Sequence, residues 1–484
     1  MEHLSGFTTR KQLGLRVFDD TQCAVIHRAV IEVLAETGVE VHSNRALTLL
    51  RKAGAHVNGT RVRFPACFLE SALKSAPSTA TIYARDMSSK MTLGGDQFYF
   101  GPGPTLVYTE DPITKERRFP TYEDECKAVK VMDALKNIDY LMDFGTISNV
   151  EKEFLDVWAF KAMYENSAKP ILHWAYTVEN LQAMIDIGTT IRGSLEEFLL
   201  YPFFGIYVEP ITPLKHEQNA LEICMTMSEY GLPVVYTPGV QGGMTAPVTL
   251  AGALVVQLCD SLSGLIIHQL THEGSPFIMG GVNSSSDLSS LQYTFGSPEF
   301  NLQNLAACNM AHYYNIPVFT SGGCTDSKCV DQQAGADMAT NVLIAALGGG
   351  NLIHDVGYME SAMMSSVTAM VIADELIGQA KHIIRGIEIS EETLALDLIK
   401  HIGPGGNYIG EEHTFQHFRK EWYLPEIHNR QRHANWQDDG SPTMGDLADR
   451  KIARILAEHT PNYLQADIVT ACDDIIQKLS KNKK

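Results

Sequence analysis

A dense group of polar residues follows a short apolar run in the C-terminal half of the chain. Residues 317–320 are apolar or β-prone, and the stretch TSGGCTDSK at 320–328 then brings hydroxyl, thiol, carboxylate and amine groups together. Its glycines permit tight turns and a close approach of backbone to a ligand. A plain surface loop is the alternative, but such a group at the end of a buried strand is suited to binding or catalysis.

Other residue patterns with chemical potential are weaker. Cys324 and Cys329 lie close together, and the pairs His268/His272 and His413/His417 each have helical spacing. None has the H-E-x-x-H arrangement or a third ligand in the sequence nearby, so we predict no metal site. We find no G-x-S-x-G elbow and no convincing Ser-His-Asp set, and no catalytic side chain is assigned. A zinc-dependent barrel lyase or hydrolase stays open as an alternative that requires bound metal.

The composition excludes several classes of protein. The 484 residues are 45% hydrophobic and 20% charged, with a net charge of −19 and a pI near 5.3. This acidity disfavours nucleic acid and anionic lipid as partners. The apolar stretch at 250–270 is interrupted by Gln257, Asp260 and His268, so we expect a buried helix and no membrane span. The N-terminal residues lack the apolar core of a signal peptide, and the nine cysteines lack paired spacing. Both features predict a cytoplasmic protein with reduced thiols.

Strand-like runs that end in glycine or polar residues recur from residue 98 onward. There are eight, at 98–103, 138–146, 169–177, 203–210, 233–243, 276–287, 317–328 and 351–360. Helical patterns lie between most of them, at 121–135, 151–166, 214–231, 246–273, 301–315 and 331–349. After the first run, residues 104–120 indicate a hairpin extension in place of a helix.

Eight strand–helix units predict an α/β fold of the TIM (β/α)8 barrel class, with its chemistry at the carboxyl ends of the strands. An open doubly wound sheet is the rival, but no G-x-G-x-x-G follows the first strand. We expect an N-terminal α+β cap at 1–97, the barrel at 98–361 and a C-terminal helical extension at 362–484. A hairpin with Asn-Gly at its tip is predicted near 57–65 within the cap.

Several strings, in order along the chain, carry a family resemblance. They are GVEVHSNRALTLLRKAGAHV, YARDMSSKMTLGGDQFYFGPGP, SGGCTDSKCVDQQAG, GGNLIHDVGYMESAMMSS and YIGEEHTFQHFRKEWYLPEIHNR. From about residue 10 to 460 the chain resembles the trimethylamine methyltransferase (MttB) superfamily. The resemblance implies a TIM barrel that transfers a methyl group from a methylated amine to the cobalt of a corrinoid carried by a separate small protein.

One departure from the family is informative. Archaeal members that demethylate trimethylamine use pyrrolysine, whereas this chain contains only the twenty standard residues. Relatives without pyrrolysine act on quaternary amines, so the resemblance implies a quaternary-amine:corrinoid methyltransferase. No permanently bound cofactor is expected, because the corrinoid belongs to the partner protein.

The implied substrate dictates what the site must contain. A trimethylammonium group has no N–H to donate and is held by aromatic faces, each contributing roughly 0.5–2 kcal/mol. Candidates for this cage at the predicted strand ends are Phe100, Phe144, Trp174, Tyr207 and Tyr236. For each ring the alternative is that it fills the barrel core.

Polar residues are candidates to bind the two charged groups of a betaine, its ammonium group and its carboxylate. Glu209, and also Asp143, could neutralise the ammonium group. His354, Gln241, Asn283 and Gln333 are candidates for the carboxylate end or the rim of the mouth.

Glycine betaine is the first substrate candidate. Proline betaine, carnitine and γ-butyrobetaine are the alternatives, as is a non-catalytic betaine-binding protein. The expected partners are a corrinoid protein and the small amine, with a homo-oligomer possible in principle and no nucleic acid or membrane.

Overall fold

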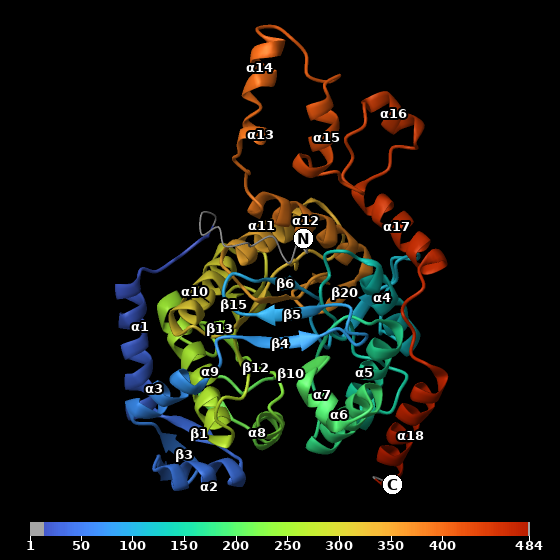
Figure 1. Ribbon diagram of the computed structural model, residues 1–484. Coiled ribbons are helices and arrows are strands. Elements are labelled where there is room, and N and C mark those ends of the chain that lie inside the picture. Colours follow the sequence, from blue (N-terminus) through green and yellow to red (C-terminus); the bar gives the residue numbers. More distant parts are fainter. Residues whose placement is uncertain (1–13, 483–484) are drawn as a thin grey trace.

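The computed structural model describes residues 14–482, apart from the side chains of 282–284 and 482. Seven parallel strands form one curled sheet in the order β6-β18-β17-β14-β12-β10-β9 (Figure 1). Their bounds are β6 Tyr99–Phe100, β9 Ile171–His173, β10 Phe204–Val208, β12 Val234–Tyr236, β14 Phe277–Gly280, β17 Val318–Ser321 and β18 Leu352–His354. Each of them lies in a segment predicted to be a barrel strand.

The remaining predicted strand segment bridges the two edges of this sheet. The Asp139 N–H donates to Phe100 O (2.6 Å), and the Leu141 N–H donates to Pro170 O (2.9 Å). Leu141 also forms a parallel bridge with Ile171. The segment is too irregular to be a full strand, but its hydrogen bonds connect β6 to β9 and complete the ring.

Helices cover the outside of the sheet (Figure 1). They are α4 Tyr122–Ala134, α5 Leu155–Asn166, α6 Val178–Arg192, α7 Leu195–Leu200, α8 Gln218–Tyr230, α9 Leu250–Thr271, α10 Pro298–Tyr314, α11 Gln332–Leu347 and α12 Val367–Ile384. The stop signals act as expected, since α8 ends at Gly231 and α10 at Asn315, both with left-handed backbone. Helix α9 is long and apolar enough to cross a membrane, but 72% of its most apolar window is buried inside the protein, as the sequence predicts.

The N-terminal helices pack against α8, α9 and α10, and the last N-terminal hairpin closes the amino end of the barrel. The N-terminal elements are α1 Asp20–Glu32, a π-helical turn Val33–Thr37, β1 Val39–Val41, α2 Asn44–Ala53, β2 His56–Asn58, β3 Arg61–Arg63, α3 Ala66–Ser75, β4 Ala80–Tyr83 and β5 Lys90–Leu93. The β2–β3 hairpin has Asn58-Gly59 at its tip, as predicted. The β4–β5 hairpin contributes Ile82 and Leu93 to the apolar cluster inside the barrel. It therefore seals that end and leaves the carboxyl ends of the strands as the open mouth.

Short strands extend the loops at this mouth. They are β7 Tyr108–Glu110, β8 Arg117–Arg118, β11 Lys215–His216, β13 Gly239–Gly242, β15 Val282–Asp287, β16 Gln292–Thr294, β19 Tyr358–Met359 and β20 Met364–Ser366. The antiparallel β7–β8 pair is the hairpin expected after the first strand. The pairing of β11 with β1 ties the cap to the barrel.

The chain after α12 is helical, while α12 itself, which the sequence analysis placed in the C-terminal extension at 362–484, lies with the helices on the barrel. The part after α12 contains α13 Glu391–Leu394, α14 Leu396–Ile402, α15 Glu412–Glu421, α16 His433–Asp438, α17 Met444–Glu458 and α18 Ala466–Asn482. Helices α17 and α18 pack back against the barrel helices, whereas α13 to α16 project away from the body (Figure 1).

Candidate active site at the barrel mouth

The two faces of the curled sheet carry two separate apolar clusters. Leu172, Val235 and Phe319 belong to the inner cluster, against which Tyr207 packs. Phe100 and Tyr236 belong to the outer cluster under the helices. Side chains alternate between faces along a strand. The face of each strand therefore decides which of the predicted cage residues can reach the mouth.

Two predicted cage rings lie on the wrong face. Tyr207 is paired with Val235 and Val208 with Tyr236, so the Tyr236 side chain points outward when Tyr207 points inward. The Tyr236 hydroxyl is hydrogen-bonded to His216 Nδ1 (2.6 Å), and its ring packs on Gly264 of α9 so closely that a Cβ there would overlap it. Phe100 packs edge-on against Phe98, outside the barrel. The structure therefore removes Phe100 and Tyr236 from the cage, because both rings fill the layer between sheet and helices.

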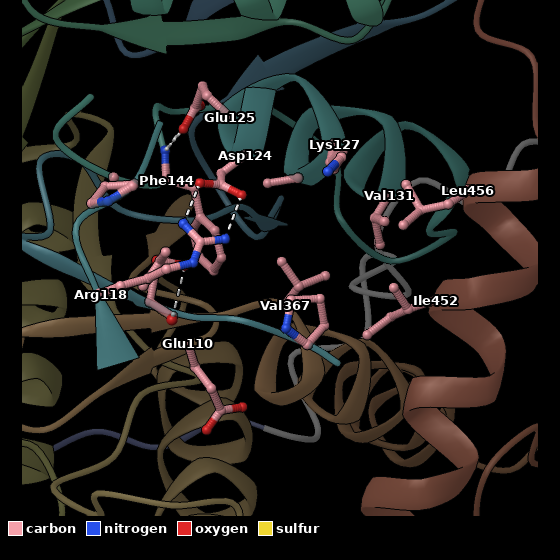
Figure 2. Close-up of a pocket in the computed structure, with 16 residues that line it drawn as sticks. Glu110, Arg118, Asp124, Glu125, Lys127, Val131, Phe144, Val367, Ile452 and Leu456 are labelled. Carbon is pink, nitrogen blue, oxygen red and sulfur yellow. Dashed lines mark hydrogen bonds and ion pairs between the residues drawn. The ribbon is translucent and has the colours of Figure 1, made fainter. Parts of the chain in front are cut away.

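Phe144 occupies a different pocket (Figure 2). It lies beside Glu125 and Arg118, between α4, the β7–β8 hairpin and α17, in a space of about 40 Å³. The buried Glu125 carboxylate accepts the Phe144 N–H (3.1 Å), and burial raises the pKa of this carboxyl well above its usual value. Phe144 therefore also leaves the cage, and Glu125 fixes the loop that follows Asp143.

A pocket of about 290 Å³ opens at the carboxyl ends of β6, β9 and β10. Trp174, Tyr207 and Glu209 all face this pocket, so the structure brings three of the predicted site residues together. The other lining residues come from the first-strand loop, the end of β9 and the first turns of α8: Pro104, Thr105, Ala175, Tyr176, Val208, Asn219, Ala220 and Ile223.

Trp174 is held in place by a buried carboxylate. Its indole Nε1 donates to Asp143 Oδ1 (2.8 Å), and Asp143 Oδ2 accepts the Thr105 N–H (3.3 Å). The indole also meets Tyr176 edge-on at a centroid distance of 4.6 Å. These contacts fix the plane of the ring at the pocket wall, as a cation-binding face requires.

Tyr207 and Glu209 form the second wall. They lie two residues apart at the end of β10 and therefore share one face. The Tyr207 hydroxyl donates to Glu209 Oε1, and the Tyr207 ring packs on Phe319 at 5.6 Å. The Glu209 side chain is exposed to the open space of the pocket. Desolvation raises the pKa of its carboxyl, opposed by the Tyr207 hydrogen bond and reinforced by the charge of Asp355.

Two residues that the sequence reasoning did not select complete this site. Asp355 and Tyr358 follow β18, and a Cβ on Gly103 would overlap both the Asp355 carboxylate and the Tyr358 hydroxyl. The Tyr358 hydroxyl donates to Pro104 O at the pocket wall. The Asp355 backbone has a φ of 73°, a left-handed conformation that few non-glycine residues adopt and that often marks functional sites. Burial raises the pKa of the Asp355 carboxyl, opposed by His354 and by a hydrogen bond from Ser321. We call Asp143, Trp174, Tyr207, Glu209, Asp355 and Tyr358 the mouth cluster.

His354 lies beneath this cluster and faces inward. Its Nδ1 is 2.8 Å from Thr320 O, its Nε2 is 3.1 Å from Asp355 Oδ1, and its ring packs on Phe319 at a tilt of 30° with a centroid distance of 3.9 Å. Burial lowers the pKa of the imidazole, opposed by Asp355. Both ring nitrogens therefore have partners within the protein, so this geometry favours positioning of Asp355 over the predicted contact with a substrate carboxylate.

The other polar candidates lie away from the 290 Å³ pocket. Gln241 is part of β13, where its backbone N–H donates to Thr245 Oγ1, and Gln333 is exposed in the first turn of α11. The side chain of Asn283 lies outside the described residues. A role for Gln241 or Gln333 at the rim stays a prediction.

The charged side chains at the pocket are all acidic. Asp143, Glu209 and Asp355 bring carboxylates to it or beside it, and no lysine or arginine is among its described lining residues. Buried carboxylates without a cationic partner are costly. An organic cation between the rings would relieve this cost. Among residues 14–482 no group of three or more His, Cys, Asp or Glu side chains is arranged to hold a metal ion.

Replacing Gly103 by alanine tests how tightly the mouth cluster is packed. Its backbone does not have a positive φ, so the new methyl group acts by displacing the Asp355 carboxylate and the Tyr358 hydroxyl. We expect at least a tenfold loss of activity, with overpacking that costs about 1–3 kcal/mol of stability. Gly335→Ala is the control, because a Cβ there meets no atom within 4 Å. Full activity of Gly103→Ala would show that this contact is not needed.

The fold resembles that of known amine methyltransferases. The crystal structure of the Methanosarcina barkeri monomethylamine methyltransferase (MtmB) matches with a TM-score of 0.53 and 11% identity, covering 97% of this chain and 89% of that chain. The hydroxylamine MtmB complex matches with a TM-score of 0.54 and the same coverage. At this identity the likeness shows the TIM-barrel type of fold, which the sequence predicts.

The family itself is shown by sequence. Residues 2–483 match the family Trimethylamine methyltransferase (MTTB), and the chain belongs to it. The trimethylamine methyltransferase MttB of Desulfitobacterium hafniense (strain DSM 10664 / DCB-2) is 28% identical, covering 98% of this chain and 96% of that protein. The glycine betaine methyltransferase of D. hafniense (strain Y51) is 30% identical, covering 93% and 94%. The resemblance stated from the sequence is therefore confirmed, and the protein is a methyltransferase of this family.

Proposed function

We propose that the protein transfers a methyl group from a quaternary amine, with glycine betaine as the first candidate, to the Co(I) corrinoid of a separate corrinoid protein. The observation that carries this proposal is the composition of the mouth cluster. It combines aromatic faces with carboxylates, and no lysine or arginine is among the described lining residues of the pocket. The 30% identical glycine betaine methyltransferase supports the choice of substrate.

The two ends of the pocket suit the two charges of a betaine. Trp174, Tyr207 and Glu209 surround the place for the trimethylammonium group. Asn219 and Ala220 lie in the first turn of α8, where Glu217 makes no side-chain cap. Free N–H groups and the dipole at a helix N-terminus favour an anion. We therefore place the substrate carboxylate toward α8, a role for which the sequence reasoning chose His354.

The chemistry needs no acid or base from the protein. As the C–N bond breaks, both bonding electrons stay on nitrogen, and the leaving group is a neutral tertiary amine. The methyl carbon forms its new bond with the acceptor, which supplies a strong nucleophile. The mouth cluster binds the cation, directs one methyl outward and limits the access of water.

Transfer to free cob(I)alamin tests the proposed reaction without the partner protein. With glycine betaine, the absorption spectrum should change from Co(I) to methyl-Co(III), and dimethylglycine should appear. Calorimetry with proline betaine, carnitine and γ-butyrobetaine ranks the alternative substrates. Tight binding without methyl transfer, either to cob(I)alamin or to a reduced corrinoid protein, would favour the non-catalytic betaine-binding protein.

The raised carboxyl pKa values predict a pH dependence of binding. In the empty site the pKa values of Glu209 and Asp355 lie above the ordinary value of about 4. A bound cation stabilises the ionised forms, so binding lowers both pKa values and releases protons. Affinity for glycine betaine should therefore rise with pH through the raised pKa values and level off above them. Calorimetry at pH 5 and 7.5, in buffers of different ionisation enthalpy, measures both effects, and affinity that is higher at pH 5 would contradict this assignment.

A further inference from the structure

A fully buried histidine lies directly beside the aromatic wall of the pocket. His173 is the last residue of β9 and precedes Trp174 in the chain. Its ring stacks on Phe160 of α5 at a centroid distance of 5.8 Å, in the layer between the sheet and the helices. Phe160 and the residue paired with His173 on β10, Ile206, carry no charge. The polar partners of the imidazole therefore decide its protonation state.

The two ring nitrogens of His173 face two acceptors. Nε2 lies 2.7 Å from the backbone O of Asp156, and a carbonyl oxygen can only accept, so Nε2 carries a proton. Nδ1 lies 3.6 Å from Asp143 Oδ1 and has no hydrogen-bond partner among the described residues. In a neutral imidazole with its proton on Nε2, the Nδ1 lone pair would face the lone pairs of the carboxylate. A second proton, on Nδ1, turns this repulsion into an ion pair.

The surroundings of His173 are rich in carboxyl groups. Asp143 and Asp156 are fully buried, and Glu125 of α4 accepts the N–H of the peptide that follows Asp143. Burial raises the pKa of the Glu125 carboxyl, reinforced by the charge of Asp143. Burial also raises the pKa of Asp156, opposed by the Tyr176 N–H and by His173. In the described part of the chain, no lysine or arginine is paired with these three carboxyls. Since buried carboxylates need a cationic partner, the imidazolium form of His173 is favoured.

The carboxylate opposite Nδ1 holds two residues of the pocket wall. Asp143 Oδ1 accepts the Trp174 Nε1–H (2.8 Å), and Asp143 Oδ2 accepts the Thr105 N–H (3.3 Å). Thr105 has a φ of 63°, a left-handed conformation that β-branched residues rarely adopt. Both Trp174 and Thr105 line the 290 Å³ pocket. A positive charge on His173 keeps Asp143 ionised and able to accept both hydrogen bonds.

The residue opposite Nε2 holds a third part of the wall. The Asp156 carboxylate accepts the Tyr176 N–H (2.7 Å), and the Tyr176 ring meets Trp174 edge-on. His173 therefore connects the two buried aspartates that fix the aromatic side of the pocket.

We propose that His173 is a positioning residue, which is protonated at neutral pH and whose ion pair with Asp143 fixes the Trp174 ring at the pocket wall. His173 does not touch the substrate itself. The consequence for substrate binding rests on the proposed function, whereas the ion pair can be tested without any substrate.

Heteronuclear NMR of the full chain, labelled in histidine and tryptophan, tests the ion pair directly. At pH 7.5 both ring nitrogens of His173, assigned by their loss in His173→Gln, should have the chemical shifts of protonated nitrogens. In Asp143→Asn the counter-charge is gone, so His173 should become neutral and lose the proton on Nδ1. An unprotonated Nδ1 in the wild-type chain, or an imidazolium that persists in Asp143→Asn, would overturn the proposal.

The same spectra report on the indole. The Trp174 Nε1–H, assigned with Trp174→Phe, should resonate downfield in the wild-type chain and move upfield in His173→Gln. Glutamine can still donate to Asp156 O, but it brings no charge to Asp143. A Trp174 signal that is unchanged in His173→Gln would show that His173 does not position the ring.

Calorimetry with glycine betaine measures the consequence for binding. His173→Gln should weaken binding at least tenfold. The matched control is His312→Gln, because His312 Nε2 also contacts a backbone oxygen, Gly349 O (3.0 Å), but lies in the last turn of α10, toward the sealed end of the barrel. Its affinity should equal that of the wild type. Equal affinity of His173→Gln and the wild type would overturn the positioning role, whereas a wild-type chain that binds no glycine betaine would contradict the proposed function alone.

Discussion

Replacing Glu209 by glutamine should weaken the binding of glycine betaine by about 10- to 100-fold, roughly 1.4–2.8 kcal/mol. The change keeps the shape of the side chain and removes one negative charge from the pocket wall. A carboxylate about 4 Å from a quaternary nitrogen contributes roughly 1–4 kcal/mol between the limits of bulk water and a protein surface, part of which is offset by desolvation. Glutamine can still accept the Tyr207 hydrogen bond, so the aromatic wall should stay in place.

The control for this variant is Glu196→Gln. Glu196 is exposed in α7, which precedes β10 and therefore lies toward the sealed end of the barrel. The Glu196→Gln change removes the same charge from the protein, but at a distance from the mouth. Calorimetry should show unchanged affinity for Glu196→Gln. Equal affinity of Glu209→Gln and wild type would show that Glu209 does not face the cation.

Three replacements of Asp355 should separate its carboxylate from its backbone. Asp355→Asn keeps the shape and tolerates the left-handed backbone, so we expect a stable protein whose methyl transfer is reduced at least 100-fold. Asp355→Gly relieves the strain at a φ of 73° but also removes the carboxylate, so it should be equally inactive without loss of stability. Asp355→Ala should be inactive and less stable than Asp355→Gly by about 1–2 kcal/mol, because alanine is strained in this conformation.

Thermal unfolding and turnover on the same three proteins provide the comparison. If all three variants lose activity while Asp355→Gly is more stable than Asp355→Ala, the carboxylate is the functional group. An active Asp355→Gly protein would instead show that only the backbone turn matters. The active site would then have to be built from Glu209 and the rings alone.

The positions of the strands were predictable from the sequence. The face of the strand to which each side chain points did not enter the choice of the candidate site residues. Each predicted barrel segment coincides with a strand or with the segment that bridges the sheet edges. The signal that made this possible is the recurrence of apolar runs ending in glycine or polar residues with helical patterns between most of them. Trp174 and Tyr207 were chosen for their place at strand ends, and so were Phe100 and Tyr236. Alternation along the strand separates two of these rings once one inward residue is known: Tyr207 packs on the inner cluster, whereas Tyr236 follows the inward Val235 and points outward. Sequence alone does not say which face is inward when both are apolar.

Asp355 and Tyr358 were missed for another reason. They belong to the string HDVGY, in which His354 was preferred because it ends the eighth predicted strand. The left-handed backbone at Asp355 turns its carboxylate toward the mouth, and this conformation has no sequence signature outside glycine and asparagine-rich turns. The contact with Gly103 joins residues about 250 positions apart and depends on the closure of the ring.

The central claim is that the mouth recognises a permanent positive charge by rings and carboxylates. Calorimetry with glycine betaine and with 3,3-dimethylbutanoate tests it most directly, since the two molecules have the same shape and carboxylate and differ by carbon in place of the charged nitrogen. We predict that glycine betaine binds at least tenfold more tightly, and that the Glu209→Gln variant loses most of this difference. Equal affinity for the two compounds, or tighter binding of the isostere that lacks the positive charge, would contradict the account.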